Sequence, residues 1–124
     1  MVLSKIGGDF MGKLEKKTPL IFYKTKAGKD VVVEWFRSLR KEDRRIVGQD
    51  LMRVQYRWPV GMPLCRPLGG GLWEVRSSLG NRIVRILFCF RDEHLVVLHG
   101  FVKKTQRTPT DELELARKRK DEIS

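Results

Sequence analysis

LWEVRSSLGNRIVRILFCFRDEHLVVLHGFVKKTQRTP occupies residues 72–109, and this stretch decides the fold. It contains three runs rich in β-branched, aromatic and other apolar residues, separated by the turn sequences Leu79-Gly80-Asn81 and Arg91-Asp92-Glu93. Apolar runs with short polar or glycine-containing turns between them are typical of antiparallel strands. The stretch therefore predicts a three-stranded β-meander.

Alternation of side chains along a strand assigns each residue of the meander to one of two faces. The middle run has an apolar row that we expect to face the core: Val84, Ile86, Phe88 and Phe90. Its opposite side carries Ile83, Arg85, Leu87, Cys89 and Arg91. In the third run we place Val96 and Leu98 in the core, and the arginine side receives Val97, His99, Phe101 and Lys103. In the first run Trp73 and Val75 share the core side, so the arginine side receives Glu74 and Arg76. One sheet face is predicted to be apolar and the other cationic.

Two amphipathic helices are predicted ahead of the meander. Asp30 is the expected N-cap of the first, whose apolar stripe has the helical spacing i, i+3, i+4, i+7: Val32, Trp35, Phe36 and Leu39. The second follows Arg40 and ends before Pro59, with a stripe at similar spacing: Val47, Leu51, Val54 and Trp58. We expect them to form an antiparallel hairpin that covers the apolar sheet face.

A last helix is predicted at residues 109–122. Thr108 is its expected N-cap, Pro109 its first residue and Asp111 the acid of a capping box. The helix begins acidic and ends basic, as the helix dipole favours, and its thin apolar contact consists of Leu113 and Ala116. We expect it to lie loosely on the sheet, with its basic end free for a partner.

The chain of 124 residues is long enough for one hydrophobic core. We divide it into a flexible N-terminal tail, residues 1–18, and a single domain, residues 19–124. A short strand at residues 19–25 opens the domain, and the segment 59–71, rich in proline and glycine, is predicted as a loop. The fold class is α+β: an N-terminal helical hairpin packed on a small, mostly antiparallel four-stranded sheet, plus a C-terminal helix.

Charge is the least ordinary property of the composition. The chain has 26 Lys and Arg against 15 Asp and Glu, a formal net charge of +11, which indicates a polyanionic partner: nucleic acid or an acidic protein. The alternative is charge that serves only solubility. No apolar run is long enough to span a membrane and the N-terminus lacks a secretory signal, so we expect a cytoplasmic protein. Cys65 and Cys89 are predicted to be free thiols in a reducing compartment, and neither a metal site nor a cofactor is predicted.

The runs LWEVR, RILFCF and LVVLHGFVKKTQRTPTDELELARKR resemble the RelE/ParE superfamily of bacterial toxins, in particular its HigB-type, phage-related branch. The resemblance covers about residues 19–122. It implies a RelE-like fold and a type II toxin that cleaves mRNA, commonly on the ribosome, and so inhibits translation. It also implies a HigA-like helix-turn-helix antitoxin as partner, through which the pair would bind operator DNA.

Carried over residue by residue, the resemblance implies functional roles for Arg85, Arg76 and Lys103, with Lys104 beside it. The family's lysine ahead of the first arginine is replaced by Glu74, and the catalytic tyrosine and histidines of some members have no match. The general base and the general acid therefore stay unassigned.

Metal-independent cleavage of RNA needs cations for the phosphorane charge, a base for the 2′-hydroxyl and an acid for the 5′ oxygen. Arginine suits the first task, so we expect Arg76 and Arg85 to hold the scissile phosphate. Lys103 among other cations has the environment that lowers a lysine pKa, which suits it to proton transfer. Glu74 is either a second candidate base or a plain salt-bridge partner of an arginine. RNA-binding roles are predicted for Phe101, Lys104, Gln106, His99 and Arg107, with Phe101 stacking on a base.

Two other functions fit the same sequence. One is a ParE-like inhibitor of DNA gyrase that cleaves nothing. The other is a non-enzymatic nucleic-acid-binding module whose basic face only docks on a phosphate backbone. Retention of both arginines favours the endoribonuclease.

Overall fold

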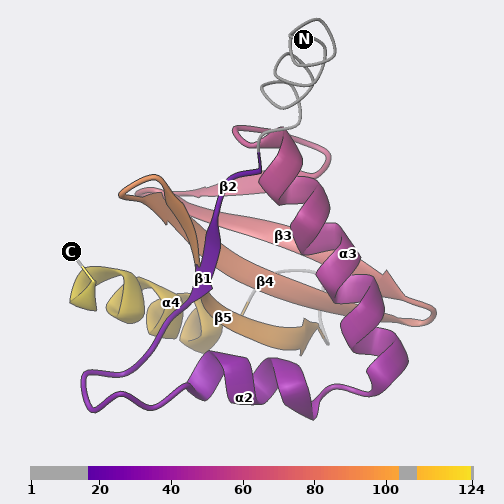
Figure 1. Cartoon of the computed structure of the whole chain (residues 1–124), viewed down its shortest axis with the longest axis horizontal. Coiled ribbons are helices and arrows are strands. Elements are labelled where there is room, and N and C mark those ends of the chain that lie inside the picture. The colour runs from indigo at the N-terminus through magenta and orange to yellow at the C-terminus, as the bar shows by residue number, and fades with distance from the viewer. Residues whose placement is uncertain (1–16, 104–108, 124) are drawn as a thin grey trace, which may run out of the picture.

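The computed structural model describes residues 17–103 and 109–123. Over these residues the chain forms five strands and three helices (Figure 1): β1 (Leu20–Phe22), α2 (Val31–Ser38), α3 (Lys41–Arg57), β2 (Cys65–Gly69), β3 (Leu72–Leu79), β4 (Arg82–Arg91), β5 (His94–Lys103) and α4 (Thr110–Glu122). Of the predicted N-terminal tail, residues 1–16 lie outside the described part. Thr18 is already attached to α3, because its amide donates to Gln55 O at 2.9 Å and its carbonyl accepts from Gln55 Nε2 at 2.8 Å.

A single mixed sheet forms the centre of the molecule, with the strand order β1-β5-β4-β3-β2. Only β1 and β5 run parallel, and the other three pairs are antiparallel. The predicted meander is confirmed, but the prediction of four strands is wrong. The fifth, β2, lies within the segment 59–71 that was expected to be a loop. Pro67 is compatible with β2 because an edge strand needs donors on only one side.

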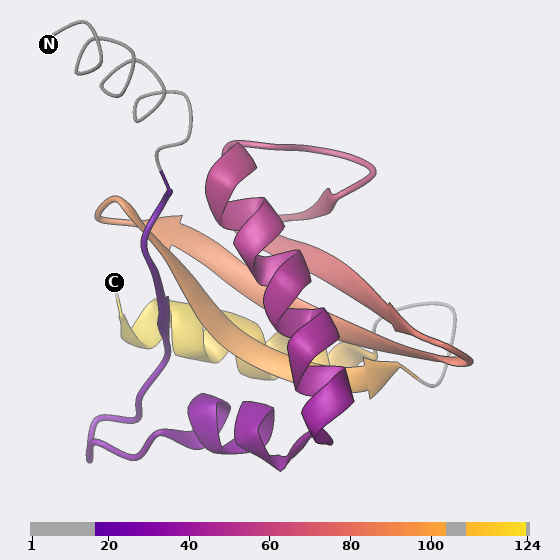
Figure 2. The same ribbon diagram turned by 45° about the vertical axis from the view of Figure 1, so that its right-hand side comes forward.

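Helices α2 and α3 cover one face of the sheet (Figures 1 and 2). Their predicted apolar stripes are confirmed: Val32, Val47, Leu51 and Val54 are buried, and Trp35 contacts Gly100 of β5. The predicted antiparallel hairpin is wrong, because α2 packs on β5 while α3 diverges from it and packs on β3. If α2 and α3 lay side by side as a hairpin, they would leave part of the apolar sheet face uncovered. Arg44 stabilises the corner, since its Nη1 donates to the carbonyls of Arg37 and Leu39 at 2.9 and 3.0 Å.

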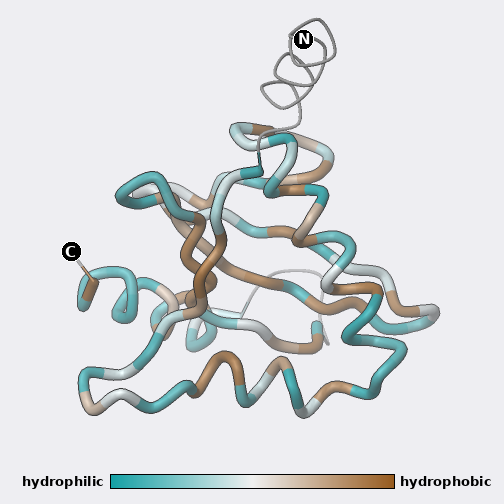
Figure 3. The backbone as a smooth tube through the Cα atoms, viewed as in Figure 1, coloured by the Kyte–Doolittle hydropathy of each residue, from teal (hydrophilic) through white to brown (hydrophobic). Residues whose placement is uncertain are grey.

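Helix α4 lies on the opposite face, against β5 and β4. Its tube is mostly hydrophilic in Figure 3. Ala116 is fully buried and Leu113 partly, as predicted, but the expected loose packing with a free basic end is wrong. Arg117 donates to the carbonyls of Leu68 and Gly69, and Arg119 donates to Leu98 O at 2.8 Å. Carbonyl groups of the sheet therefore hold the basic end of this helix.

The start of α4 also differs from the prediction. The helix begins at Thr110 with Pro109 in the N-cap position, and Thr108 lies outside the described residues. Asp111 does not reach back to the cap, because its Oδ1 accepts from the Glu112 amide at 3.0 Å.

A β-bulge in β5 changes the faces predicted for its first half. His99 pairs with Leu87 while Val97 pairs with Phe88, so Leu98 has no direct partner on β4. Val97 consequently joins the core side and Val96 the arginine side, the reverse of the prediction. From His99 to Lys103 the predicted phase holds.

Neither sheet face matches the simple division into apolar and cationic. Leu87 and Cys89 share the side of Arg85 but are buried, in the region where α4 covers this face. Phe90, expected in the core row, is 42% exposed. Near the other end of β4 none of the described helices lies over the same face, and the candidate site lies there.

Both cysteines are buried and unpaired, which confirms the predicted free thiols. Burial raises the pKa of the Cys65 thiol to about 11 and also raises the pKa of Cys89. Among the described residues, no helix has the length and apolarity needed to cross a lipid bilayer.

Candidate active site

Strand register brings the three predicted cations to one face of the sheet. Arg76 on β3 lies directly opposite Arg85 on β4, and Arg85 lies opposite Phe101 on β5. Lys103 on β5 lies opposite Ile83, and Ile83 is two residues before Arg85 on β4. Directly opposed residues of antiparallel strands share a face, so the predicted convergence of Arg76, Arg85 and Lys103 is confirmed. Their chemical roles remain predictions.

Strand β2 adds a cation that the sequence analysis missed. Arg66 lies directly opposite Glu74, hence on the same face, and it is exposed. Its absence from the predicted site follows from the assignment of residues 59–71 to a loop. The sequence did contain a signal, because three glycines between CRPL and LWEV are typical of a hairpin turn. Gly69, Gly70 and Gly71 adopt positive φ angles of 94°, 62° and 83° in that turn.

A buried ion pair forms the floor of the site. Arg85 Nη1 donates to Glu74 Oε1, and the two residues are 1% and 0% exposed. Burial of two charges is tolerated here because each desolvated group has an opposite charge in contact. Glu74 is therefore the salt-bridge partner that was one of its two predicted roles. Its other predicted role, as a general base, stays a prediction.

Burial likewise changes what Arg85 can do. Its guanidinium lies below the surface and its charge faces Glu74, whereas Arg66 and Arg76 are exposed. Arg66 and Arg76 are therefore accessible to a ligand on this face, and Arg85 lies beneath them.

Lys103 has the environment that the sequence predicted for it. Desolvation lowers the pKa of its ammonium group, and the nearby guanidinium groups of Arg85, Arg76 and Arg66 lower it further, while Glu74 acts in the opposite direction. A lowered pKa increases the fraction of neutral amine at a given pH, which makes proton exchange with a substrate easier. Lys103 is partly exposed, so a ligand on this face can reach it.

His99 and Phe101 are less accessible than predicted. The Phe101 residue is 7% exposed, and its ring stacks on the His99 imidazole with the ring centroids 5.6 Å apart. His99 Nε2 lies 2.7 Å from Glu112 Oε1 on α4. The stacking partner of Phe101 in this structure is thus a side chain of the protein. The predicted RNA-binding roles of His99 and Phe101 stay predictions.

The remaining predicted RNA-binding residues are Lys104, Gln106 and Arg107, and they lie outside the described residues. Lys103 is the last described residue before them.

The chain is similar to a known protein family and to a solved structure. Residues 34–121 match the sequence profile of the family described as phage-derived protein Gp49-like. No curated protein matches the sequence. A chain in the crystal structure of the archaeal RelE–RelB complex from Pyrococcus horikoshii OT3 is 21% identical and gives a TM-score of 0.45, over 74% of this chain and 99% of that chain.

Proposed function

The chain belongs to the phage-derived Gp49-like family, a family of RelE/HigB-like toxins, and from that premise we propose that it is a metal-independent endoribonuclease that cleaves mRNA on the ribosome. The predicted membership of the RelE/ParE superfamily is confirmed. The proposal places the protein in the cytoplasm as the toxin of a type II toxin–antitoxin pair. Its effect on the cell is the inhibition of translation.

One observation carries the proposal: Lys103 lies among Arg66, Arg76 and Arg85 on a single sheet face, and its pKa is lowered there. The cations that could bind phosphate also lower the pKa of the lysine among them. An amine with a lowered pKa beside arginines that can bind phosphate oxygens is suited to proton transfer at a phosphodiester.

The proposed reaction uses the RNA's own ribose as nucleophile. The 2′ oxygen forms a bond to the adjacent phosphorus, the bond from phosphorus to the 5′ oxygen breaks, and a 2′,3′-cyclic phosphate and a 5′-hydroxyl result. Arg76 and Arg66 bind the non-bridging oxygens, on which negative charge grows. The 2′ hydroxyl loses its proton as the new bond forms, and the leaving 5′ oxygen gains one. Lys103 either accepts the first proton as the neutral amine or donates the second as the ammonium group, and water carries out the other transfer. Arg85, held by Glu74, is a positioning residue that keeps the electrostatic potential around Lys103 positive.

Among the described residues exposed on this face, none besides Lys103 is suited to act as a general acid or a general base. We infer that the ribosome supplies the alignment of the ribose and the phosphate that the enzyme itself does not impose. The proposed partners are thus mRNA, the ribosome and a HigA-like helix-turn-helix antitoxin, with operator DNA bound only through that antitoxin.

Cleavage assays with purified components test the proposal. Programmed ribosomes and naked mRNA are incubated with the wild-type protein, Lys103→Ala, Arg76→Ala and the control Lys118→Ala, an exposed cation on α4. We expect the first two substitutions to slow cleavage on ribosomes by about 100-fold or more, as loss of a proton-transfer or phosphate-binding group does. Lys118→Ala should retain the wild-type rate.

Three outcomes would contradict parts of the proposal. Equal cleavage of naked and ribosome-bound mRNA rules out ribosome dependence. Full activity of Lys103→Ala removes this face as the site. Absence of any cleavage, together with inhibition of DNA supercoiling by gyrase, supports the ParE-like alternative instead.

A further inference from the structure

The sheet face that carries the proposed active site has one more row of side chains, next to Lys103. Strand register places Ser78 on β3 opposite Ile83 on β4, and Ile83 opposite Lys103 on β5. Directly opposed residues of antiparallel strands share a face, so these three side chains lie on the face of Arg76 and Arg85. Ser78 is exposed, and Ile83 and Lys103 are partly exposed. The proposed reaction uses Lys103 and leaves Ser78 and Ile83 without a role.

Ile83 is an apolar side chain that the hydrophobic core does not use. Among the described residues, it belongs neither to the buried core cluster nor to the partly buried side chains that pack against this cluster. Its neighbour in the chain, Val84, points to the opposite face and is fully buried. A flat apolar surface laid over Ile83 would remove apolar area from water, which is favourable. Ile83 is therefore suited to contact a ligand.

The position of Ile83 relates it to the phosphate of the proposed substrate. Directly opposed residues have Cβ atoms about 5 Å apart, and diagonal neighbours lie about 7–8 Å apart. Lys103 is the direct neighbour of Ile83, and Arg76 is a diagonal neighbour. In RNA one ribose separates each base from the adjacent phosphate. A phosphate held between Arg76 and Lys103 thus brings a base within reach of Ile83.

Ser78 adds a hydroxyl group that the fold leaves available. The preceding residue, Ser77, points to the other face, is fully buried, and donates from Oγ to Asp50 Oδ2 of α3 at 2.7 Å. The exposed Ser78 hydroxyl has no such partner among the described residues. A serine hydroxyl can donate or accept a hydrogen bond, so it can pair with an edge of any base.

We propose that Ser78 and Ile83 form the subsite for a nucleobase next to the scissile phosphate, with the base lying against Ile83 and one of its edges hydrogen-bonded to the Ser78 hydroxyl. A purine fits better than a pyrimidine, because its two rings cover more of the isoleucine. The inference rests on the proposed function in one respect, since it takes the phosphate to lie between Arg76 and Lys103.

An NMR titration of the full chain tests the subsite. The probes are adenosine 5′-monophosphate and ribose 5-phosphate, which has the same phosphate but no base. We expect the adenosine nucleotide to bind about fivefold more tightly, as stacking of a base does. It alone should shift the Ile83 methyl signals upfield, because the ring current of a base lying on them shields these groups. Cytidine 5′-monophosphate should bind with an affinity between the two.

Substitutions separate the contacts with the base from those with the phosphate. Ile83→Thr keeps a β-branched residue in the strand but removes apolar surface, and it should equalise the affinities for adenosine 5′-monophosphate and ribose 5-phosphate. Ser78→Ala should weaken only the nucleotide, by about two- to threefold. Lys103→Ala should weaken both probes by the same factor. Urea unfolding checks that each variant is folded, which is expected because neither Ser78 nor Ile83 belongs to the core.

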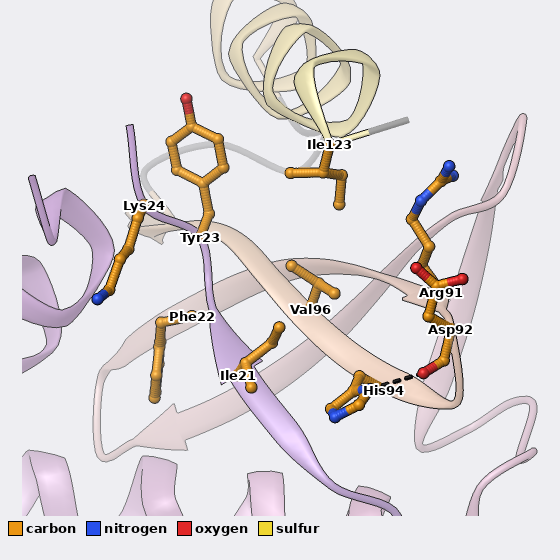
Figure 4. A pocket seen from close by; sticks show the side chains of 9 residues that line it. All are labelled: Ile21, Phe22, Tyr23, Lys24, Arg91, Asp92, His94, Val96 and Ile123. Carbon is orange, nitrogen blue, oxygen red and sulfur yellow. Dashed lines mark hydrogen bonds between the residues drawn. The ribbon is translucent and has the colours of Figure 1, made fainter. Parts of the chain in front are cut away.

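Ile21→Thr is the matched control. Ile21 is also an isoleucine on a strand and is 48% exposed. It lines a pocket of about 590 Å³ between β1, the β4–β5 turn and the end of α4, together with the cations Lys24 and Arg91 (Figure 4). The control therefore asks whether any exposed isoleucine near cations binds a base. Ile21→Thr should leave the affinities for both probes unchanged.

Three results overturn the inference. One is equal affinity of the wild-type protein for adenosine 5′-monophosphate and ribose 5-phosphate. Another is a preference for the nucleotide that survives Ile83→Thr. The third is an upfield shift of the methyl signals of Ile21 or Leu87 in place of Ile83, which would locate the base in the pocket of Figure 4 or near His99.

Failure of the subsite and failure of the proposed function give different results, because no probe is cleaved. A protein that cleaves mRNA but does not distinguish the two probes has the proposed activity without this subsite. A protein that prefers the nucleotide through Ile83 but cleaves no RNA has the subsite without the proposed activity.

Discussion

The pKa of Lys103 is lowered by desolvation and by residues that are remote in sequence. Its own strand supplies partial desolvation, β4 and β3 supply the guanidinium groups of Arg85 and Arg76, and β2 supplies Arg66. Each of these positive charges makes protonation of the amine less favourable. Glu74 limits the effect because its carboxylate favours the protonated form. The balance is a lysine whose pKa is lowered but whose surroundings stay cationic enough to attract phosphate.

The lowered pKa of Lys103 has a consequence for stability. Between its folded-state pKa and the usual value near 10.5, the unfolded chain binds more protons than the folded chain, so stability contributed by this group rises with pH. We therefore expect Lys103→Met to be more stable than the wild type at pH 7, and the difference to shrink as the pH approaches 10.5. Urea unfolding of both proteins across this range measures it. A difference that is independent of pH would contradict the lowered pKa.

Gly100 is a position where only hydrogen fits. A Cβ atom there would overlap the Trp35 ring of α2, which packs directly on the β5 backbone. We expect Gly100→Ala to destabilise the protein by about 1–3 kcal/mol, the usual cost of overpacking a core.

Gly48→Ala in α3 is the matched control, because a Cβ at this position meets nothing within 4 Å. Alanine is the better helix former, so this change should stabilise by about 0.5–1 kcal/mol. Chemical denaturation of both variants checks the pair. Equal effects of the two substitutions on the free energy of unfolding would show that overlap with Trp35 does not determine the effect of Gly100→Ala.

At the scale of elements, the bulge in β5 provides a contact that helps to hold α4 in place. The bulge leaves Leu98 without a partner on β4, and its carbonyl accepts a hydrogen bond from Arg119 of α4. Arg119 also lies over the Tyr23 ring, with Cζ 5.1 Å from the ring centroid, and Tyr23 in turn donates to Glu122. A helix with few apolar residues is thus held by polar contacts to backbone groups that the bulge and the sheet edge leave available.

Loss of the Arg119 contact should therefore loosen α4. We expect Arg119→Met to lower the free energy of unfolding by about 1–3 kcal/mol, because the Leu98 carbonyl loses its partner and the cation–π contact is lost. Thermal unfolding and amide exchange of α4 measure the effect. Lys118→Met, on the exposed side of the same helix, is the control and should change little. Equal effects of the two would mean that removal of a positive charge, and not the carbonyl contact, matters.

At the scale of the whole molecule, the formal net charge is +11. Arg66, Arg76 and Lys103 contribute to it from one sheet face, which would suit a phosphate backbone.

RNA binding should depend on salt in proportion to the cations that contact phosphate. Three contacts by Arg66, Arg76 and Lys103 predict that the logarithm of the binding constant falls with the logarithm of salt concentration with a slope of at least about −2. Replacing both arginines by alanine should reduce the magnitude of the slope by about 1.4, at roughly 0.7 per contact. Fluorescence anisotropy with single-stranded RNA measures these slopes. The double variant Arg57→Ala/Lys118→Ala, with the same change in charge on other surfaces, should keep the wild-type slope.

The sequence by itself determined the features that depend on consecutive residues. Period-2 alternation placed Arg76, Arg85 and Lys103 on one face, and the helical spacing of apolar residues identified the buried stripes of α2 and α3. Motifs in the same strands identified the superfamily. All of these signals are local, because the direction of a side chain on a strand or helix follows from its neighbours in the chain.

Only the tertiary structure decided what those residues contact. Arg66 belongs to the site only because β2 pairs with β3, and the bulge at Leu98 reverses the faces of Val96 and Val97. The buried contact between Glu74 and Arg85 likewise depends on the pairing of β3 with β4. The physical reason is that register, desolvation and the field at a charged group are set by segments that are distant along the chain. No local period contains that information.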